Sequence, residues 1–189
     1  MIKMPEKITT EKVILERPNP ITFKLAEEIY AAVDKSREIL NEWLPWADAT
    51  TSAEAEFSGF LYDYCDKKWN ENSGFAYLIR DAETGKFLGV IDVIEIKESS
   101  KSAEIGYWLS VDAEGKGYMS AALKALENEA FKIFNRLQIR NDTQNLRSVN
   151  VAKRAGYKLD GVLRQERWLE KQQRYGDTNV WSKLKSETE

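Results

Sequence analysis

The sequence VDAEGKGYMSAALKAL, Val111–Leu126, leads from an expected strand into an expected helix through two glycines, and the rest of the fold can be worked out from it. Gly115 and Gly117 precede apolar residues that recur at helical spacing. The first N–H groups of a helix lack partners within the helix and carry partial positive charge, and glycine lets a ligand approach the backbone closely. The pattern is typical of an anion site, such as one for a pyrophosphate, although a plain turn would use the same residues.

Two familiar phosphate-binding motifs are excluded here. The stretch lacks the third glycine of the dinucleotide fingerprint, and no Gly-Lys-Ser/Thr follows it as in a P-loop. The two glycines by themselves therefore do not identify the ligand.

The amino-acid composition excludes several types of active site. The 189 residues include no histidine and one cysteine, Cys65, so histidine bases and Ser-His triads are excluded. A zinc site would need carboxylates alone, and we expect no metal. The net charge is −3 with both signs interspersed, which argues against a nucleic-acid partner. No stretch approaches the roughly 18 apolar residues of a membrane span, and the single cysteine and the absence of an apolar leader predict a cytoplasmic protein.

The periodicity predicts one domain over residues 1–189, with a mixed sheet and helices around it. Pro45 separates the first two helices, and Thr51 with Glu54 three residues on is expected to form a capping box for the second helix. The expected strands are 11–18, 74–81, 86–96, 102–111, 136–141, 157–170 and 177–185, and the expected helices are 23–43, 51–70, the stretch after Gly117 and 145–155.

Four segments together resemble a known family. They are AEIGYWL (Ala103–Leu109), EGKGYMSAAL (Glu114–Leu123), N-x-x-S-x-x-V-A-x-x-x-G-Y (Asn145–Tyr157) and LDGVLRQ (Leu159–Gln165). In order and spacing they are similar to the GCN5-related N-acetyltransferases (GNAT), in particular to the RimL/RimJ-like branch of ribosomal-protein N-terminal acetyltransferases.

The resemblance implies an α/β (α+β) GNAT fold, in which two central parallel strands of a mixed sheet splay apart beside flanking helices. It also implies acetyl-CoA as co-substrate, with direct transfer of the acetyl group to an amine. The backbone of Glu114–Met119 would hold the pyrophosphate. The cofactor-binding residues implied are Trp108, Leu109, Val111, Glu114, Gly115, Lys116, Gly117, Tyr118, Met119, Asn145 and Ser148.

Catalytic roles carry over from the same resemblance. Ser148 would donate a proton to the departing CoA thiolate, although serine is also common in the first turn of a helix. Asn145 would contact the pantetheine, or would simply cap the helix.

The general base is where this chain departs from the family. The family's glutamate, nineteen residues after the serine, is replaced by Arg167, and Glu166 stands one position earlier. A one-residue offset in a strand turns a side chain to the opposite face, so Glu166 would serve only through a bulge or a shifted register. The alternatives are that the base has moved to Glu104 or to a water chain, or that the substrate differs.

The acceptor pocket is expected between the first two helices. Trp43 and Trp46 flank Pro45 there and would stack on a flat group, and Glu104 is expected to contact the acceptor amine. Acidic residues between positions 48 and 66 would attract a cation, or form a solvated helix face.

The leading hypothesis is an acetyl-CoA-dependent N-acetyltransferase, by default acting on a protein N-terminal α-amine. One alternative is a small-molecule acceptor, such as an aminoacyl-nucleotide antibiotic of the kind acetylated by self-immunity enzymes of microcin C producers. The other is a CoA-binding module without catalysis. Either a monomer or a homodimer is expected.

Overall fold

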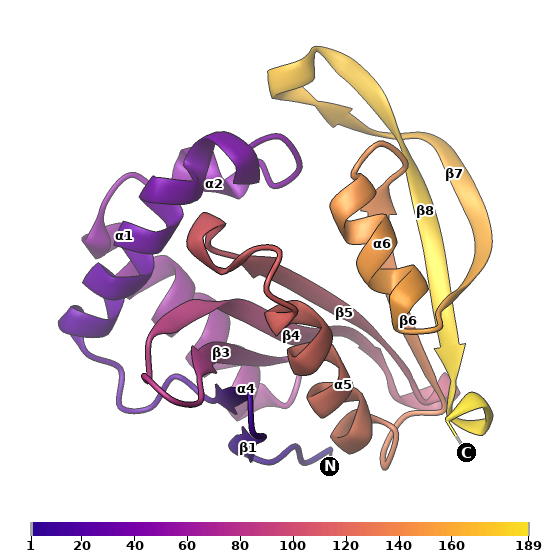
Figure 1. Cartoon of the computed structure of the whole chain (residues 1–189), viewed down its shortest axis with the longest axis horizontal. Helices are drawn as coiled ribbons and strands as arrows, with labels where there is room; N and C mark the ends of the chain where they lie inside the picture. Colours follow the sequence, from indigo (N-terminus) through magenta and orange to yellow (C-terminus); the bar gives the residue numbers. More distant parts are fainter. Residues whose placement is uncertain (1, 189) are drawn as a thin grey trace.

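An eight-stranded mixed sheet runs through the computed structural model, which describes residues 2–188. The strand order is β1-β2-β3-β4-β5-β6-β8-β7, and every neighbouring pair is antiparallel except β5 and β6 (Figure 1). The strands are β1 (Lys7–Thr9), β2 (Val13–Glu16), β3 (Phe75–Asp81), β4 (Phe87–Lys97), β5 (Ser102–Leu109), β6 (Arg136–Asp142), β7 (Lys158–Leu169) and β8 (Arg174–Leu184).

Helices connect and cover the strands. The α-helices are α1 (Phe23–Leu40), α2 (Trp46–Ala49), α3 (Ala53–Ala55), α4 (Lys67–Glu71), α5 (Tyr118–Ala130) and α6 (Leu146–Arg154). A π-helix, η1 (Glu56–Asp66), joins α3 to α4. Short 3-10 turns are η2 (Glu98–Ser100), η3 (Val111–Ala113), η4 (Glu170–Gln172) and η5 (Lys185–Glu187). None of the helices within residues 2–188 is long and apolar enough to cross a membrane.

The structure corrects the sequence-based elements in several places. The expected helix 51–70 is divided into α3, the π-helix η1 and α4, and the short helix α2 precedes it. Strand β1 is additional to the expected strands, because KIT is too short for a period-2 pattern to stand out. Helix α1 ends at Leu40, three residues before the expected end. The expected capping box at Thr51 is wrong: Ser52 is the N-cap, and its side chain accepts from the backbone N–H of Ala55.

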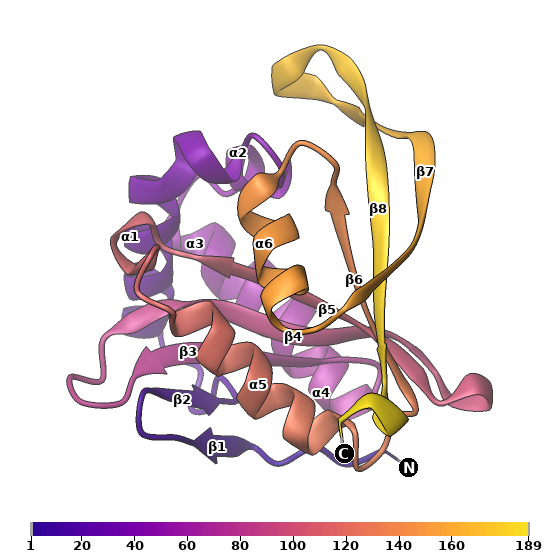
Figure 2. The ribbon, with the colours of Figure 1, turned by 45° about the vertical axis from the view of Figure 1, so that its right-hand side comes forward.

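Two apolar clusters lie on the two faces of the sheet. Helices α5 and α6 contribute Leu123, Leu126 and Ala152 to one cluster. Helix α1 contributes Ile29 and Val33 to the other. Figure 2 shows α5 and α6 in front of the sheet, with α1 and α3 behind it. Because alternate residues of a strand point to opposite faces, β5 contributes to both clusters.

The centre of the sheet is split, as the resemblance implied. Strands β5 and β6 are parallel, but they pair only at Ser102–Glu104 with residues 136–138. Beyond Glu104 the two strands have no paired residues, and the rest of β5 stays paired with β4 up to Leu109. A gap therefore opens between the carboxyl ends of these two strands.

The last two strands form a long hairpin whose tip projects beyond the rest of the sheet (Figure 1). The pairing of β7 with β8 shifts register between Leu163 and Arg167, and Gln165 there has a φ of 52°. A bulge in β7 produces this shift, and it changes the direction of the side chains that follow it.

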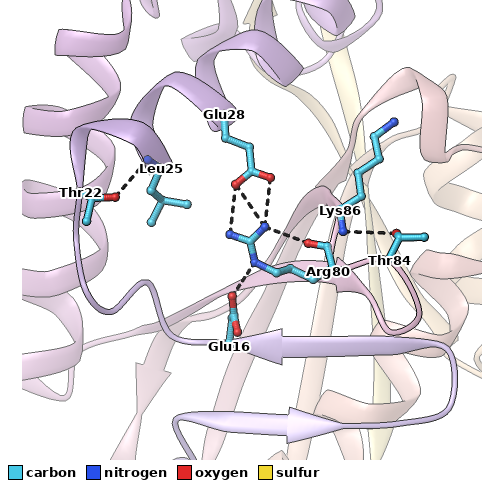
Figure 3. Close-up of polar contacts among 8 residues, drawn as sticks. Glu16, Thr22, Leu25, Glu28, Arg80, Thr84 and Lys86 are labelled. Carbon is cyan, nitrogen blue, oxygen red and sulfur yellow. Dashed lines mark hydrogen bonds and ion pairs between the residues drawn. The ribbon is translucent and has the colours of Figure 1, made fainter.

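An ionic network ties the outer part of the sheet to α1. The Arg80 guanidinium on β3 donates through Nε to Glu16 on β2 at 2.5 Å and through Nη1 to Glu28 on α1 at 3.1 Å (Figure 3). Thr22 caps the same helix by accepting from the backbone N–H of Leu25 at 3.2 Å. These contacts hold the start of α1 against the sheet, away from the central split.

Candidate active site

A cavity of about 1230 Å³ lies at the split between β5 and β6 and is lined by side chains from both faces of the sheet. Its wall includes Gly115 and Gly117 at one end and Trp43 and Trp46 at the other. Of the sequence-predicted site residues, the structure brings to it Trp43, Trp46, Glu104, Trp108, Leu109, Glu114, Gly115, Gly117, Tyr118, Met119, Asn145, Ser148 and Glu166.

Two predicted residues do not line the cavity. The backbone N–H of Val111 donates to the buried Ser36 Oγ at 3.0 Å, so it is already engaged with α1. The Lys116 ammonium donates to the carbonyl of Asp112 at 2.7 Å, on the exposed side of its loop. For these two residues, the loop backbone turns the polar groups away from the cleft.

The glycine loop has the backbone geometry of an anion cradle. Gly115 and Gly117 have φ values of 71° and 76°, a region that side chains other than glycine rarely occupy. Helix α5 begins directly after Gly117, so its N-terminal N–H groups meet the cavity wall at this point. The Tyr118 hydroxyl reaches away to Asp81 Oδ2 at 2.5 Å, and Arg147 on α6 pairs with Glu114 at 3.0 Å.

Ser148 lies within a polar cluster on the α6 side of the split. Its Oγ is 2.9 Å from the Tyr107 hydroxyl and accepts from Asn141 Nδ2 at 3.1 Å. Asn145 is the N-cap of α6, and its Oδ1 accepts from the backbone N–H of Ser148 at 3.1 Å. The capping role of Asn145 is thus present in the structure, alongside its place in the cavity wall.

Burial raises the pKa of Tyr107 to about 12, although its hydrogen bond to Ser148 acts in the opposite direction. The phenol therefore stays protonated at neutral pH. It is available to donate a hydrogen bond to Ser148 Oγ.

Two carboxyl groups line the cavity on the face of the sheet opposite to Ser148 and α6. Asp92 on β4 is 9 % exposed, and its Oδ2 accepts from the Tyr64 hydroxyl of η1 at 2.5 Å. Its other oxygen, Oδ1, is buried without a hydrogen-bond partner and lies against Gly106 of β5. A side chain at position 106 would occupy the space of that carboxylate. Burial raises the pKa of Asp92, and the Tyr64 hydrogen bond opposes this.

Glu104 is the second of these groups. It points to the same face of β5 as Gly106 and accepts from Gln138 Nε2 at 3.3 Å. Burial raises the pKa of Glu104, while Arg140 and the hydrogen bond from Gln138 act to lower it. A carboxyl with a raised pKa in a cavity is a physical indication of acid–base function.

Glu166 also lines the cavity, because the bulge at Gln165 turns it inward. It forms an ion pair with Arg140 of β6. Burial would raise the pKa of Glu166, but the contacts with Thr178 and Arg140 outweigh this and hold the pKa below its ordinary value. The bulge required by the sequence argument is present, yet the carboxylate it delivers is neutralised by an arginine.

The far end of the cavity is formed by aromatic residues and by the β7–β8 hairpin. Trp46 packs at 5.8 Å, ring centroid to ring centroid, on Trp108, and is 39 % exposed. Lys171 at the hairpin tip donates to the carbonyl of Glu38 at 2.7 Å, and Gln172 donates to that of Glu42 at 2.8 Å. The hairpin is thereby tied to the end of α1, beside the tryptophans.

Sequence reasoning missed three members of this site. Tyr107 and Asn141 lie on β5 and β6, where they have the pattern of ordinary strand residues, and Asp92 interrupts the apolar run 87–94 of β4. A lone aspartate in that apolar run was the one available signal. Among residues 2–188 no group of three or more acidic or cysteine side chains is arranged to hold a metal ion.

The mixed sheet, with the glycine loop before α5 beside the separating parallel strands β5 and β6, has the architecture of an acyl-CoA-dependent acetyltransferase of the GNAT class. Residues 19–158, most of the chain, match the family described as Acetyltransferase (GNAT) domain, and the chain belongs to that family. It is an acetyl-CoA-dependent acetyltransferase, and the proteins similar to it include ribosomal-protein acetyltransferases.

Three similar proteins illustrate this relationship. The putative ribosomal N-acetyltransferase YdaF of Bacillus subtilis (strain 168) is 29% identical over 143 residues, covering 75% of this chain and 76% of the relative. The ribosomal-protein-serine acetyltransferase of Escherichia coli (strain K12) is 33% identical over 113 residues, covering 59% and 62%. The microcin C7 self-immunity acetyltransferase MccE, solved with acetyl-CoA and AMP, is 25% identical with a TM-score of 0.82 and 93% of each chain covered.

Proposed function

We propose that this chain, acting as a single catalytic domain, acetylates the N-terminal α-amine of a protein, in the simplest case a ribosomal protein. One observation carries the proposal: a single cavity connects the glycine loop and Ser148 on one face of the sheet with Glu104 and Asp92 on the other. Two of the similar proteins have names that refer to ribosomal substrates, which supports this choice of acceptor.

In the proposed mechanism, the backbone of Gly115–Met119 binds the pyrophosphate of acetyl-CoA, and the thioester lies in the split. The free edge of β5, beyond its last pair with β6 at Glu104, offers backbone groups to the pantetheine and to the thioester carbonyl. Acetyl-CoA supplies an activated acyl group, so no covalent enzyme intermediate is needed.

Two side chains of this chain handle the protons. The amine nitrogen forms a bond to the acetyl carbon as the carbon–sulfur bond breaks, and Glu104 takes the proton that the amine loses. Ser148 gives its hydroxyl proton to the CoA thiolate, and after product release the serine oxygen regains a proton from water while Glu104 loses its proton to water. Glu104 suits the role of base because burial raises its pKa and makes its carboxylate a stronger proton acceptor, whereas contacts that include the ion pair with Arg140 lower the pKa of Glu166 and make it a weaker one.

A small-molecule acceptor is the second candidate. It is favoured by the partly exposed Trp46 in the cavity wall, which would stack on a flat group, with Trp43 beside it. The likeness to MccE, whose structure contains AMP, points in the same direction.

The test is CoA-thiol release from acetyl-CoA with two acceptor pools run in parallel. One pool holds short peptides with varied N-terminal residues, and the other holds aminoacyl-nucleotide analogues and free amines. Turnover on peptides supports the ribosomal type of acceptor, and turnover on the second pool alone selects the small-molecule type. Stoichiometric CoA binding without turnover in either pool would refute both and select a CoA-binding module.

A ribosomal acceptor also determines the cellular compartment in which the enzyme must act. Ribosomal proteins are made in the cytoplasm, so such an acceptor implies a cytoplasmic enzyme. We propose that it acts there as a monomer or homodimer, which sedimentation at working concentration distinguishes.

A further inference from the structure

Arg167 is a cation in the cavity wall that the mechanism does not use. It occupies the position at which the resembled family has a glutamate, and it lines the cavity beside the bulge of β7. Its Nε is buried without a hydrogen-bond partner. Its Nη1 lies 3.4 Å from the carbonyl of Trp43, a long contact with a neutral group.

No carboxylate of residues 2–188 forms an ion pair with Arg167. The neighbouring Glu166 is the obvious candidate, but it is paired with Arg140 instead. Of the four arginines in the cavity wall, Arg140 and Arg147 are paired with carboxylates, whereas Arg154 and Arg167 form no ion pair among residues 2–188. Of the latter two, only Arg167 has a side-chain nitrogen that is buried without a hydrogen-bond partner.

An uncompensated guanidinium at such a position is costly. A buried donor left without a partner destabilises the folded protein, and it does so more strongly when it belongs to a charged group. Arginine cannot relieve this by losing its proton, because it stays charged at any working pH. Its planar fork matches the oxygens of a carboxylate or a phosphate in a bidentate pair. The missing counter-charge is therefore expected to come from a ligand.

The place of Arg167 indicates which ligand this is. It contacts the loop that carries Trp43, at the acceptor end of the cavity, whereas the cradle for the CoA pyrophosphate is the glycine loop before α5. Asp92 and Glu104 lie on β4 and β5, across the split from β7. A cation and two carboxyl groups thus belong to different walls of the same cavity.

We infer that Arg167 binds an anionic group, a carboxylate or a phosphate, that the acceptor carries in addition to its reacting amine. The inference rests on the proposed function, which makes this end of the cavity the acceptor site. The acceptor is then zwitterionic: its ammonium lies toward Glu104 and Asp92 and its anion toward Arg167. A polyamine lacks the anion and places a second positive charge near Arg167, so it is a poor substrate.

The first experiment measures binding and does not depend on turnover. Acetylated product peptides that begin with N-acetyl-Ser-Asp or N-acetyl-Ser-Asn, otherwise identical, are titrated into the CoA complex by calorimetry. The corresponding aminoacyl-sulfamate adenosine and its neutral amide analogue form a second pair. We expect the anionic member of at least one pair to bind about ten-fold more tightly, which corresponds to about 1.4 kcal/mol. A difference within the peptide pair indicates that Arg167 binds a peptide carboxylate, and a difference within the adenosine pair indicates that it binds a phosphate-like group.

Variants assign the effect to the side chain. Arg167→Gln abolishes the preference for the anionic member, and Arg167→Lys retains part of it. Arg167→Glu reverses it in favour of a peptide with lysine at the second position. Arg164→Gln changes an exposed arginine of the same strand that does not line the cavity, and it leaves the preference unchanged.

Two results overturn the inference. One is equal affinity of the unmodified protein for both members of each pair. The other is that Arg167→Gln weakens the binding of both members by the same factor. Turnover of the unacetylated acceptors is measured separately. Its absence with intact CoA binding refutes the proposed function, while the binding comparison still decides the role of Arg167.

Discussion

Ser148 Oγ is the acceptor in its hydrogen bond with Asn141. Asn141 Nδ2 donates to Ser148 Oγ at 3.1 Å, and Asn141 Oδ1 accepts from Asn179 Nδ2 at 3.1 Å and from Trp181 Nε1 at 3.2 Å. Two donors on Oδ1 exclude the flipped amide, so Ser148 must accept at this contact. We propose that the Tyr107 hydroxyl donates to the second lone pair, which leaves the Ser148 proton for a further acceptor, the CoA thiolate.

Replacing Ser148 by alanine is expected to lower kcat by roughly ten- to a thousand-fold, the scale of one proton-transfer group. The melting temperature should fall by a few degrees, because Asn141 Nδ2 loses its acceptor, but the protein should stay folded, because the cap of α6 uses the backbone N–H of residue 148 and not its hydroxyl. Steady-state kinetics and thermal unfolding measure the two effects. Ser58→Ala, at an exposed serine of η1, is the matched control. An unchanged kcat in Ser148→Ala would return Ser148 to a purely structural role.

Asn141→Asp tests the direction of the hydrogen bond. A carboxylate at 141 accepts, so the Ser148 hydroxyl would donate to it and would no longer point at the thiolate. We expect a loss of kcat similar to that of Ser148→Ala, although the serine is still present. The Kd for CoA, measured by calorimetry, should stay close to that of the unmodified protein. A kcat near the unmodified value would show that the orientation of Ser148 does not matter.

Gly117→Trp is expected to raise the Kd for CoA by at least ten-fold, because a side chain there strains the loop and obstructs the cradle. Gly85→Trp is the control. Gly85 has a similar φ of 72°, with open space around its Cα, but it lies in the β3–β4 hairpin away from the cavity. Both variants should lose similar stability, and only Gly117→Trp should lose CoA affinity. Equal affinities would remove the pyrophosphate from this loop.

The pH dependence of kcat/KM should identify the base. Because the pKa of Glu104 is raised, the deprotonated form needed to accept a proton appears only above the usual glutamate range. We expect kcat/KM to rise with pH on the acidic limb of its profile, as Glu104 loses its proton. Glu104→Gln should remove this acidic limb and lower kcat/KM by about 10²- to 10⁴-fold. Glu166→Gln should leave the limb in place. A limb lost only in Glu166→Gln would assign the base to Glu166.

The buried Glu56 should make stability depend on pH. It is 3 % exposed in η1, and burial raises its pKa to about 7, with Arg37 opposing the shift. The folded state therefore holds its proton between pH 4.5, where a glutamate in the unfolded chain titrates, and a pH of about 7. Stability should fall as pH rises through this window, by about 1 to 3 kcal/mol.

Urea denaturation at several pH values measures this decrease. Glu56→Gln, which has no titrating group, should reduce the slope between pH 4.5 and 7 and be relatively more stable at neutral pH. An identical slope in both proteins would contradict the assignment.

Much of this protein follows from the sequence alone. The strands and helices from Phe75 to Leu184 lie within a few residues of their expected positions, since period-2 and period-3.6 patterns are local properties of the chain. The glycine loop and the cap at Asn145 likewise follow from short motifs whose geometry depends on neighbouring residues. The turn at Gly156, with a φ of 82° after α6, belongs to the same group.

The tertiary structure alone decided which side chains meet. Tyr107 reaches Ser148 across 41 positions of sequence, and Arg167 reaches the carbonyl of Trp43 across 124. The ion pair of Glu166 with Arg140 depends on the bulge in β7, and the raised pKa of Asp92 depends on burial under η1. Burial and ion pairing depend on neighbours that are distant in the chain. A local sequence pattern therefore identifies the groups that can react, whereas only the packed fold sets their charge and their partners.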